Sequence, residues 1–313
     1  MKQPVLVLSR PLPGAMVETI LNQVTVRTYD QGEDLSVFDG AAVYATTSLD
    51  RVDAGLIEQL PDSVKLIANA GVGVDGIDLQ AAYARDIAVS NTPVVAEDTA
   101  DLTWALILAA SRRLYRTERL LRSGDWNGFV SPDYFGQRVH GKNLGIVGLG
   151  AIGEAVARRA VGFNMSVCYH GPRRKPEVEA AYNLVFCKSL KDLLMTADVI
   201  SLHCPLLPAT RHLINGETLS WVKPGAVMVN AGRGALIEEE ALVSALQGGG
   251  LGAAGLDVFE FEPRVNEILR NLDNVTLLPH IGSATGECRQ DMVLRLLQNV
   301  THFFQYGVPC DVA

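Results

Sequence analysis

The stretch from Lys142 to Lys175 constrains the fold of this chain more than any other. An apolar segment, Asn143–Val147, runs directly into Gly148-Leu149-Gly150-Ala151-Ile152-Gly153. An amphipathic pattern then continues to about Gly162 and is followed by a second apolar segment, Ser166–Tyr169. A strand, a glycine-rich turn, a helix and a second strand in this order are typical of a unit that binds a dinucleotide.

Each glycine in this turn has a separate expected role. Gly148 allows a tight turn, Gly150 allows the backbone to approach a pyrophosphate, and Gly153 allows the helix to pack closely on the strand. The free N–H groups at the helix N-terminus, including those of Ala151 and Ile152, are expected to face the phosphates.

The residues after the second strand indicate which dinucleotide binds. A site for NAD usually carries Asp or Glu there to hold the ribose 2′-OH, whereas this chain has His170-Gly171-Pro172-Arg173-Arg174-Lys175. Arginine can grip a phosphate through two parallel N–H groups. We therefore expect NADP(H), with NAD as a weaker alternative, held by Pro172, Arg173 and Arg174. The competing interpretation is a solvated basic loop.

Length and composition restrict the class of protein. The 313 residues, 48% apolar and 20% charged, suggest two globular domains. A net charge of −8 disfavours a nucleic-acid-binding surface. No apolar run is long enough to cross a bilayer, and no signal peptide is evident. The five scattered cysteines indicate reduced thiols, so a cytoplasmic protein is expected, and no metal site is predicted.

Apolar segments alternate with helical patterns along the whole chain, which predicts an α/β fold with two doubly wound parallel sheets. A long helix is expected from Asp98 or Thr99, as N-cap, towards Ser123-Gly124, with its arginines on a solvated or subunit-facing surface. The last helix, about Gly286–Tyr306, should return to the first domain. The domains are therefore expected at 1–97 with 284–313, and at 98–283. Besides those already named, strands are predicted at Val5–Ser9, Val24–Thr28, Ala42–Ala45, Lys65–Asn69, Ala88–Ser90, Leu184–Phe186, Val199–His203, Ala226–Asn230, Ala253–Leu256 and Val275–Leu278, and helices near Pro13–Leu21, Val52–Leu60 and Leu79–Arg85.

Three charged residues follow predicted strands and are expected at a cleft where the carboxyl ends of the strands meet. Arg233 lies in Asn230-Ala231-Gly232-Arg233-Gly234, Glu262 precedes Pro263, and His280 follows Pro279. Together they suit reduction of a 2-oxo acid beside a nicotinamide. Arg233 would pair with the carboxylate and polarise the carbonyl, His280 would donate a proton, and Glu262 would orient the imidazole and stabilise its charged form.

Each of the three also has a structural interpretation. Arg233 could form an ion pair, His280 could be a hydrogen-bonded core residue, and Glu262 could be a surface carboxylate. Glu260 is a nearby carboxylate that could be mistaken for Glu262.

Two further motifs allow two interpretations each. Gly71-Val72-Gly73-Val74-Asp75 is either a plain turn or a pocket of backbone N–H groups for the substrate carboxylate. Asp257 either braces its turn or accepts a hydrogen bond from the nicotinamide carboxamide.

Taken together, these motifs resemble the D-isomer-specific 2-hydroxyacid dehydrogenase family over essentially the whole chain. The resemblance implies a Rossmann cofactor domain, a flavodoxin-like discontinuous substrate domain, a cleft that closes on its ligand, and a homodimer. It assigns catalysis to Arg233, Glu262 and His280. Substrate binding falls to Val72 and Gly73, together with Arg233 and His280. The cofactor is then expected to contact Gly148, Gly150, Ala151, Ile152, Gly153, Pro172, Arg173, Arg174, Cys204, Ala231, Gly232, Arg233, Asp257, His280 and Gly282.

Within that family the chain looks most like the reductases of glyoxylate and hydroxypyruvate, of hydroxyphenylpyruvate, and of 2-ketogluconate. The segment Ala45-Thr46-Thr47-Ser48-Leu49, expected to line the pocket, carries mostly small side chains and favours a small 2-oxo acid. An aromatic residue of a partner subunit, among Trp126, Phe129 and Tyr134, could close the pocket. A regulator that senses the dinucleotide without turnover is the remaining alternative.

Overall fold

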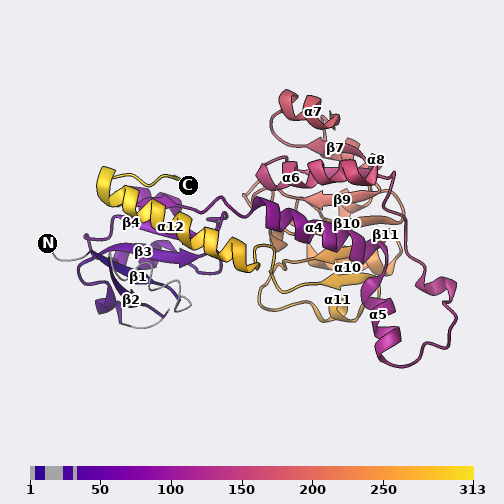
Figure 1. The fold of residues 1–313 in the computed structure, drawn as a ribbon, viewed down its shortest axis with the longest axis horizontal. Helices are drawn as coiled ribbons and strands as arrows, with labels where there is room; N and C mark the ends of the chain where they lie inside the picture. Colours follow the sequence, from indigo (N-terminus) through magenta and orange to yellow (C-terminus); the bar gives the residue numbers. More distant parts are fainter. Residues whose placement is uncertain (1–3, 11–23, 31–33) are drawn as a thin grey trace. The chain divides into compact units, whose positions relative to one another are not determined.

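A computed structural model describes residues 4–10, 24–30 and 34–313 (Figure 1). The chain divides into two compact units, each with its own parallel sheet. The first unit consists of the residues up to Val95 and of Ser283–Ala313, and the second consists of Ala96–Gly282. These boundaries lie two residues before the expected division at 97/98 and one residue before that at 283/284.

The first unit is built on a five-stranded sheet with the order β2-β1-β3-β4-β5, in which every pairing is parallel. This is the flavodoxin-like order. Helix α12 packs on one face, where Leu296 and Val300 join the core around Leu66. The elements are β1 (Val5–Leu8), β2 (Thr25–Thr28), η1 (Leu35–Phe38), β3 (Ala41–Thr47), α2 (Ala54–Gln59), β4 (Leu66–Ala70), α3 (Leu79–Ala84), β5 (Ala88–Ser90) and α12 (Gly286–Tyr306).

The expected strands and the last helix of this unit are confirmed to within two residues. The helix expected near Pro13–Leu21 lies outside the described residues. Strand β3 extends through Thr47, so the segment expected to line the substrate pocket is mostly strand, and only Ser48 and Leu49 follow it. Asp50 stabilises this end of the strand by accepting hydrogen bonds from the N–H and the hydroxyl of Thr47.

The second unit is built on a seven-stranded parallel sheet with the order β12-β11-β10-β9-β6-β7-β8. The strand order reverses between β6 and β9, and in such sheets ligands bind at the carboxyl ends of the strands beside this reversal. The strands are β6 (Asn143–Val147), β7 (Ser166–His170), β8 (Leu184–Phe186), β9 (Val199–Leu202), β10 (Ala226–Asn230), β11 (Leu251–Leu256) and β12 (Val275–Leu277).

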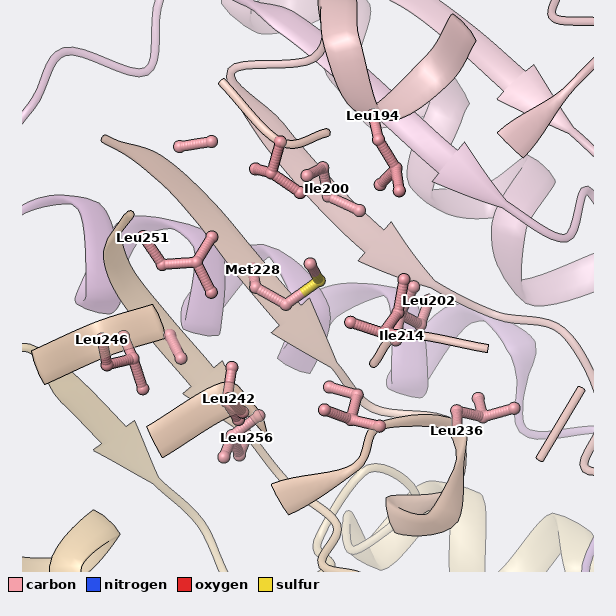
Figure 2. Packing of buried hydrophobic residues seen from close by; sticks show 14 of the residues in the cluster. Leu194, Ile200, Leu202, Ile214, Met228, Leu236, Leu242, Leu246, Leu251 and Leu256 are labelled. Atoms are coloured by element: carbon pink, nitrogen blue, oxygen red, sulfur yellow. The ribbon is translucent and has the colours of Figure 1, made fainter. Parts of the chain in front are cut away.

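Helices cover both faces of this sheet, which explains why β9 and β10 are buried along their full length. Helices α4 and α6 pack over one face. Side chains of α8 and α10 pack on the other, where Leu194, Met228 and Leu242 meet in one apolar core (Figure 2). The helices are α4 (Ala96–Ser111), α5 (Leu114–Arg122), η2 (Pro132–Tyr134), α6 (Ala151–Ala160), η3 (Val161–Phe163), α7 (Pro176–Tyr182), α8 (Leu190–Thr196), α9 (Gly216–Leu219), η4 (Gly234–Leu236), α10 (Glu239–Gln247) and α11 (Glu267–Asn271).

The prediction of a single long helix from Asp98 or Thr99 is wrong in two respects. It begins at Ala96, so both proposed caps lie inside it, and it is divided into α4 and α5 by Arg113, which adopts the left-handed conformation with φ 54°. The division has a tertiary cause, because the carbonyl of Ser111 accepts a hydrogen bond from the N–H of Gln137 at 2.6 Å. A Cβ at the preceding Gly136 would lie 2.4 Å from the same carbonyl oxygen.

Two features are absent from the described ranges. No helix there combines the length and the apolar character needed to traverse a bilayer. Likewise, no three His, Cys, Asp or Glu side chains of those residues gather in a way that could hold a metal ion.

Candidate active site

Gly148 adopts a conformation and a packing that only glycine allows. Its φ is 94°, and a Cβ built on it would lie 2.5 Å from the backbone nitrogen of Cys204. Its own N–H donates to the carbonyl of His170 at 2.9 Å. The turn after β6 is therefore held between the ends of β7 and β9, as expected for a dinucleotide-binding turn.

The next two glycines prepare the N-terminus of α6. A Cβ at Gly153 would lie 2.3 Å from the carbonyl oxygen of Gly148, so the helix sits directly on the turn. Gly150 is the N-cap and supplies no side chain to the N–H groups of the first turn, which begins with Ala151 and Ile152. A Cβ at Gly150 would meet no described atom within 4 Å. This open, uncapped helix start fits a pyrophosphate.

Other residues expected at the cofactor lie along the same edge of the sheet. Cys204 closely follows β9, and Ala231 and Gly232 directly follow β10. Burial raises the pKa of the Cys204 thiol to about 11, so this thiol is neutral at physiological pH.

The basic segment after β7 is less uniform than the sequence suggests. Arg174 forms a two-bond ion pair with Glu179, through Nε at 3.1 Å and through Nη2. Pro172 and Arg173 are exposed. Within the described part of the chain, Arg173 has no hydrogen-bonding or ionic partner. Arg174 is therefore paired inside the protein while Arg173 is not, and the contact of both with a 2′-phosphate stays a prediction.

Arg233 lies in a rigid turn at the carboxyl end of β10. The buried side chain of Asn230 donates to the carbonyl of Arg233 at 2.9 Å and accepts from the N–H of Gly232 at 3.0 Å. These two bonds fix the backbone on both sides of the guanidinium. Gly234 then opens the short helix η4.

Glu262 and His280 are brought together from two different strand ends. The Nδ1 atom of His280 lies 2.8 Å from Oε2 of Glu262, while the other carboxylate oxygen accepts from the N–H of Phe259 at 3.0 Å. The side chain of His280 is 29% exposed and that of Glu262 is 26% exposed. The carboxylate therefore orients the ring through Nδ1 and leaves Nε2 as the nitrogen that can meet a substrate.

The charge of Glu262 follows from this environment. Burial pushes its pKa upward, but hydrogen bonds from His280 and Phe259, together with the charges of His280 and Arg233, outweigh burial and lower its pKa. Glu262 is accordingly an ionised acceptor at neutral pH. The interpretation of His280 as an ordinary core histidine is inconsistent with its partly exposed ring.

Asp257 braces the turn that carries His280. Its carboxylate oxygens accept the N–H groups of Ile281 and Gly282, both at 2.8 Å, and its carbonyl accepts the N–H of His280 at 2.8 Å. Burial, the larger influence, raises the pKa of Asp257 against these hydrogen bonds. The first of the two interpretations of Asp257 is thus present in the structure, and the contact with a carboxamide stays a prediction.

Glu260 has a structural role that sets it apart from Glu262. Its side chain, 6% exposed, binds Arg211 Nη2 at 2.8 Å and His212 Nε2 at 2.6 Å. Its N–H donates to Glu239 at 2.8 Å. The two neighbouring carboxylates therefore face different partners, and only Glu262 reaches His280.

In the first unit, the Gly71–Asp75 turn is held by hydrogen bonds to its carbonyls, while two of its backbone N–H groups are left without an acceptor among the described residues. The amide of Asn69 donates to the carbonyls of Gly71 and Gly73, and that of Asn91 donates to the carbonyl of Val72. Among the described residues, the N–H groups of Val72 and Gly73 have no acceptor. This arrangement suits a carboxylate, although Val72 and Gly73 remain predicted ligands.

His203 is a candidate functional residue at a strand end that was not predicted from the sequence. It follows β9 directly, its Nε2 lies 2.8 Å from the hydroxyl of Ser201, and its buried Nδ1 meets no polar partner within the described ranges. Desolvation lowers its pKa to about 4. The placement that identified Arg233 and His280, a polar residue at the end of a strand, could have identified His203 too.

Comparison with known proteins identifies the family of this chain. Residues 104–282 match the family model for the NAD-binding domain of D-isomer-specific 2-hydroxyacid dehydrogenases. The chain is 44% identical over 269 residues to a glyoxylate reductase of Thermococcus litoralis, covering 84% of this chain and 81% of the relative. It is 39% identical over 314 residues to glyoxylate/hydroxypyruvate reductase B of Escherichia fergusonii, covering 98% and 96%.

Solved structures agree with the fold over the full length. A glyoxylate reductase from Paecilomyes thermophila superposes with a TM-score of 0.92 at 35% identity, covering 100% of this chain and 99% of the other. An NADPH-dependent glyoxylate/hydroxypyruvate reductase from Sinorhizobium meliloti, in complex with NADP and malonate, gives 0.91 at 30% identity, covering 100% and 97%. The chain therefore belongs to the D-isomer-specific 2-hydroxyacid dehydrogenase family.

Proposed function

We propose that this protein reduces a small 2-oxo acid, such as glyoxylate or hydroxypyruvate, to the D-2-hydroxy acid with NADPH. The observation that carries the proposal is the 2.8 Å contact between Glu262 and His280, in the unit that also holds the glycine turn. A carboxylate that orients a partly exposed imidazole is an arrangement for proton transfer. The names of the relatives, glyoxylate and hydroxypyruvate reductases, support the substrate class.

The roles of the residues follow from their chemistry. When bound, NADPH supplies the hydride, and Gly148, Gly150 and Gly153 leave room for its pyrophosphate. His280 would donate a proton from Nε2 to the carbonyl oxygen while Glu262 stabilises its charged ring. Arg233 would pair with the substrate carboxylate and polarise the carbonyl, and the N–H groups of Val72 and Gly73 would bind the same carboxylate.

The preference for a small substrate depends on the end of β3. Thr46 is buried and its hydroxyl donates to Asn69, so Ser48 is the small polar side chain that directly follows this strand. A Cβ at Gly71 would lie 1.8 Å from the hydroxyl of Ser48. Tight packing between these two loops favours a compact or hydroxylated 2-oxo acid over an aryl group. Hydroxyphenylpyruvate and 2-ketogluconate are the larger alternatives.

The test is the loss of NADPH absorbance with a panel of a dozen 2-oxo acids, repeated with NADH. We expect turnover with glyoxylate or hydroxypyruvate and a lower KM for NADPH. Turnover only with hydroxyphenylpyruvate or 2-ketogluconate would contradict the small substrate and support one of these larger 2-oxo acids instead. Binding of NADPH without turnover on any acid would instead support a regulator that senses the dinucleotide.

We also propose a homodimer formed through the second unit. Helix α5 and the segment after it present apolar side chains to solvent: Leu121 is 63%, Trp126 51%, Phe129 69% and Phe135 62% exposed. So many exposed large apolar residues in one segment favour burial against a second copy of the chain. Tyr134 is less available, because the guanidinium of Arg116 lies 4.5 Å from its ring centre. Light scattering should give twice the 33.7 kDa chain mass, and a monomer would refute the proposal.

A further inference from the structure

Arg174 is committed to contacts inside its own unit. Its guanidinium donates to Glu179 through Nε at 3.1 Å and through Nη2, and it lies 5.7 Å from the ring centre of Phe186. Phe186 itself packs against Tyr169, with the ring centres 5.3 Å apart. One edge of the Arg174 guanidinium is therefore already hydrogen-bonded to Glu179, and its charge is balanced by that carboxylate.

Glu179 ties this arrangement to the loop after β7. Its side chain is only 11% exposed, and it also accepts a hydrogen bond from the hydroxyl of Tyr169 at 2.7 Å. That hydroxyl in turn accepts the N–H of Lys175 at 2.7 Å. The hydrogen bonds from Arg174 and Tyr169 lower the pKa of Glu179, so it is an anion at neutral pH. Glu179 thus holds the loop at Arg174 and, through Tyr169, at Lys175.

Arg173 is in a different situation from its neighbour. It is exposed, and the described residues provide no carboxylate or carbonyl that binds its guanidinium. Both edges of its fork remain available for a phosphate. Of the two arginines at the site expected to receive the ribose 2′-phosphate, one is neutralised and one is not.

We propose that Glu179 is a specificity-determining residue: by neutralising Arg174 it limits the preference for NADPH and leaves the 2′-phosphate to Arg173. The proposal rests on the proposed use of NADPH. It predicts that removing the charge of Glu179 frees Arg174 and strengthens binding of a 2′-phosphate. A residue that only held the loop in shape would weaken that binding when altered.

The test is calorimetric titration of the full-length protein with 2′,5′-ADP and with 5′-AMP, two fragments that differ by the 2′-phosphate. Arg173→Ala should weaken 2′,5′-ADP binding by roughly 10- to 100-fold, as expected for the loss of charge-assisted hydrogen bonds, and should leave 5′-AMP binding unchanged. Glu179→Gln should strengthen 2′,5′-ADP binding by roughly 3- to 10-fold, since it adds one net positive charge beside the phosphate. The double variant Arg173→Ala, Glu179→Gln should recover part of the 2′,5′-ADP affinity that Arg173→Ala loses.

Glu177→Gln is the matched control. Glu177 lies on the same helix α7 and is exposed, and it forms no contact with Arg174. Its substitution by Gln removes the same charge as Glu179→Gln does. It should change 2′,5′-ADP affinity less than Glu179→Gln does. If both variants changed 2′,5′-ADP affinity equally, the net charge of the helix would matter and not the ion pair of Glu179 with Arg174. That result would overturn the proposal.

The remaining outcomes separate this inference from the proposed function. If the wild-type protein binds 2′,5′-ADP no better than 5′-AMP, the preference for NADPH fails, and the inference fails with it. If the wild type prefers 2′,5′-ADP while Glu179→Gln weakens binding or leaves it unchanged, only the inference is overturned. The same holds if Arg174→Ala costs more affinity than Arg173→Ala. Thermal unfolding of each variant verifies that it is folded.

Discussion

The backbone of Gly234 lies directly against the backbone of Phe259: a Cβ at Gly234 would stand 1.9 Å from the carbonyl carbon of Phe259. Gly234 follows Arg233, and the N–H of Phe259 holds the carboxylate of Glu262. The loop that carries the arginine and the loop that carries the glutamate are therefore packed on each other through one glycine. A displacement of either loop must move the other.

Gly234→Ala should consequently impair both stability and catalysis. The added methyl group overlaps backbone atoms that cannot move independently, so we expect a loss of at least ~1–3 kcal/mol in the free energy of unfolding. The value of kcat should fall because Arg233 and Glu262 shift apart. Gly162→Ala is the control, since a Cβ there meets nothing within 4 Å. Denaturant unfolding and steady-state kinetics measure the two effects, and normal values for Gly234→Ala would contradict the coupling.

For His280, the structure indicates which substitution to make. Its φ is 54°, a conformation that asparagine tolerates better than alanine does. His280→Asn should therefore keep the turn and lose the proton donor, with kcat lower by roughly 10²–10⁴-fold and little change in NADPH affinity. His280→Ala adds backbone strain of ~1 kcal/mol or more. A near-normal kcat in His280→Asn would mean that another group supplies the proton.

Glu262 and Glu260 form a natural pair for comparison. Glu262→Gln replaces the anion beside His280 with a neutral amide, so kcat should fall by roughly 10- to 100-fold, the size of a charge-assisted hydrogen bond. Glu260→Gln removes the anion that binds Arg211 and His212 and should act mainly on thermal stability. Kinetics and thermal unfolding of both variants provide the measurement. The assignment of the two carboxylates would be reversed if Glu260→Gln had the larger effect on kcat.

His203 should make stability depend on pH. Its pKa is lowered from 6.5 to about 4 because its ring is desolvated, so below pH 6.5 a proton binds the unfolded chain more readily than the folded one. Stability is then fully present above pH 6.5 and falls as the pH decreases toward 4, by at most ~3.5 kcal/mol at ~1.4 kcal/mol per pH unit.

The measurement is the free energy of unfolding at pH 7.5, 6.5 and 5.5. His203→Gln replaces the imidazole near Ser201 with a polar amide that cannot titrate, so the stability of this variant should vary less over this range than that of the wild type. If the free energy of unfolding depended on pH equally in the two proteins, His203 would be excluded as the cause of that dependence. Glu262 does not interfere with the comparison, because its pKa is lowered and it stays ionised in both states above pH 5.5.

Local sequence was a reliable guide wherever a short-range rule applied. The glycine turn Gly148–Gly153, the strand Asn143–Val147 and the helix Gly286–Tyr306 were predicted because backbone geometry and apolar periodicity act over a few residues. The pairing of Glu262 with His280 was also predictable in outline, since parallel strands bring their carboxyl ends to one edge.

The errors arose where a distant residue determined the outcome. The helix from Ala96 is divided at Arg113 because Gln137 binds the carbonyl of Ser111, which lies 26 positions earlier in the chain. Nothing in the arginine-rich segment itself indicates that contact.

The sequence alone determined that this chain has two parallel-sheet units, a dinucleotide turn and an arginine, glutamate and histidine at strand ends. Each of these depends on spacing along the chain. Only the tertiary structure decided which charges are paired: Arg174 with Glu179, Glu260 with His212, and Glu262 with His280. Ion pairs depend on distances of a few ångströms between side chains, and these are set by how strands and helices pack and not by the order of residues.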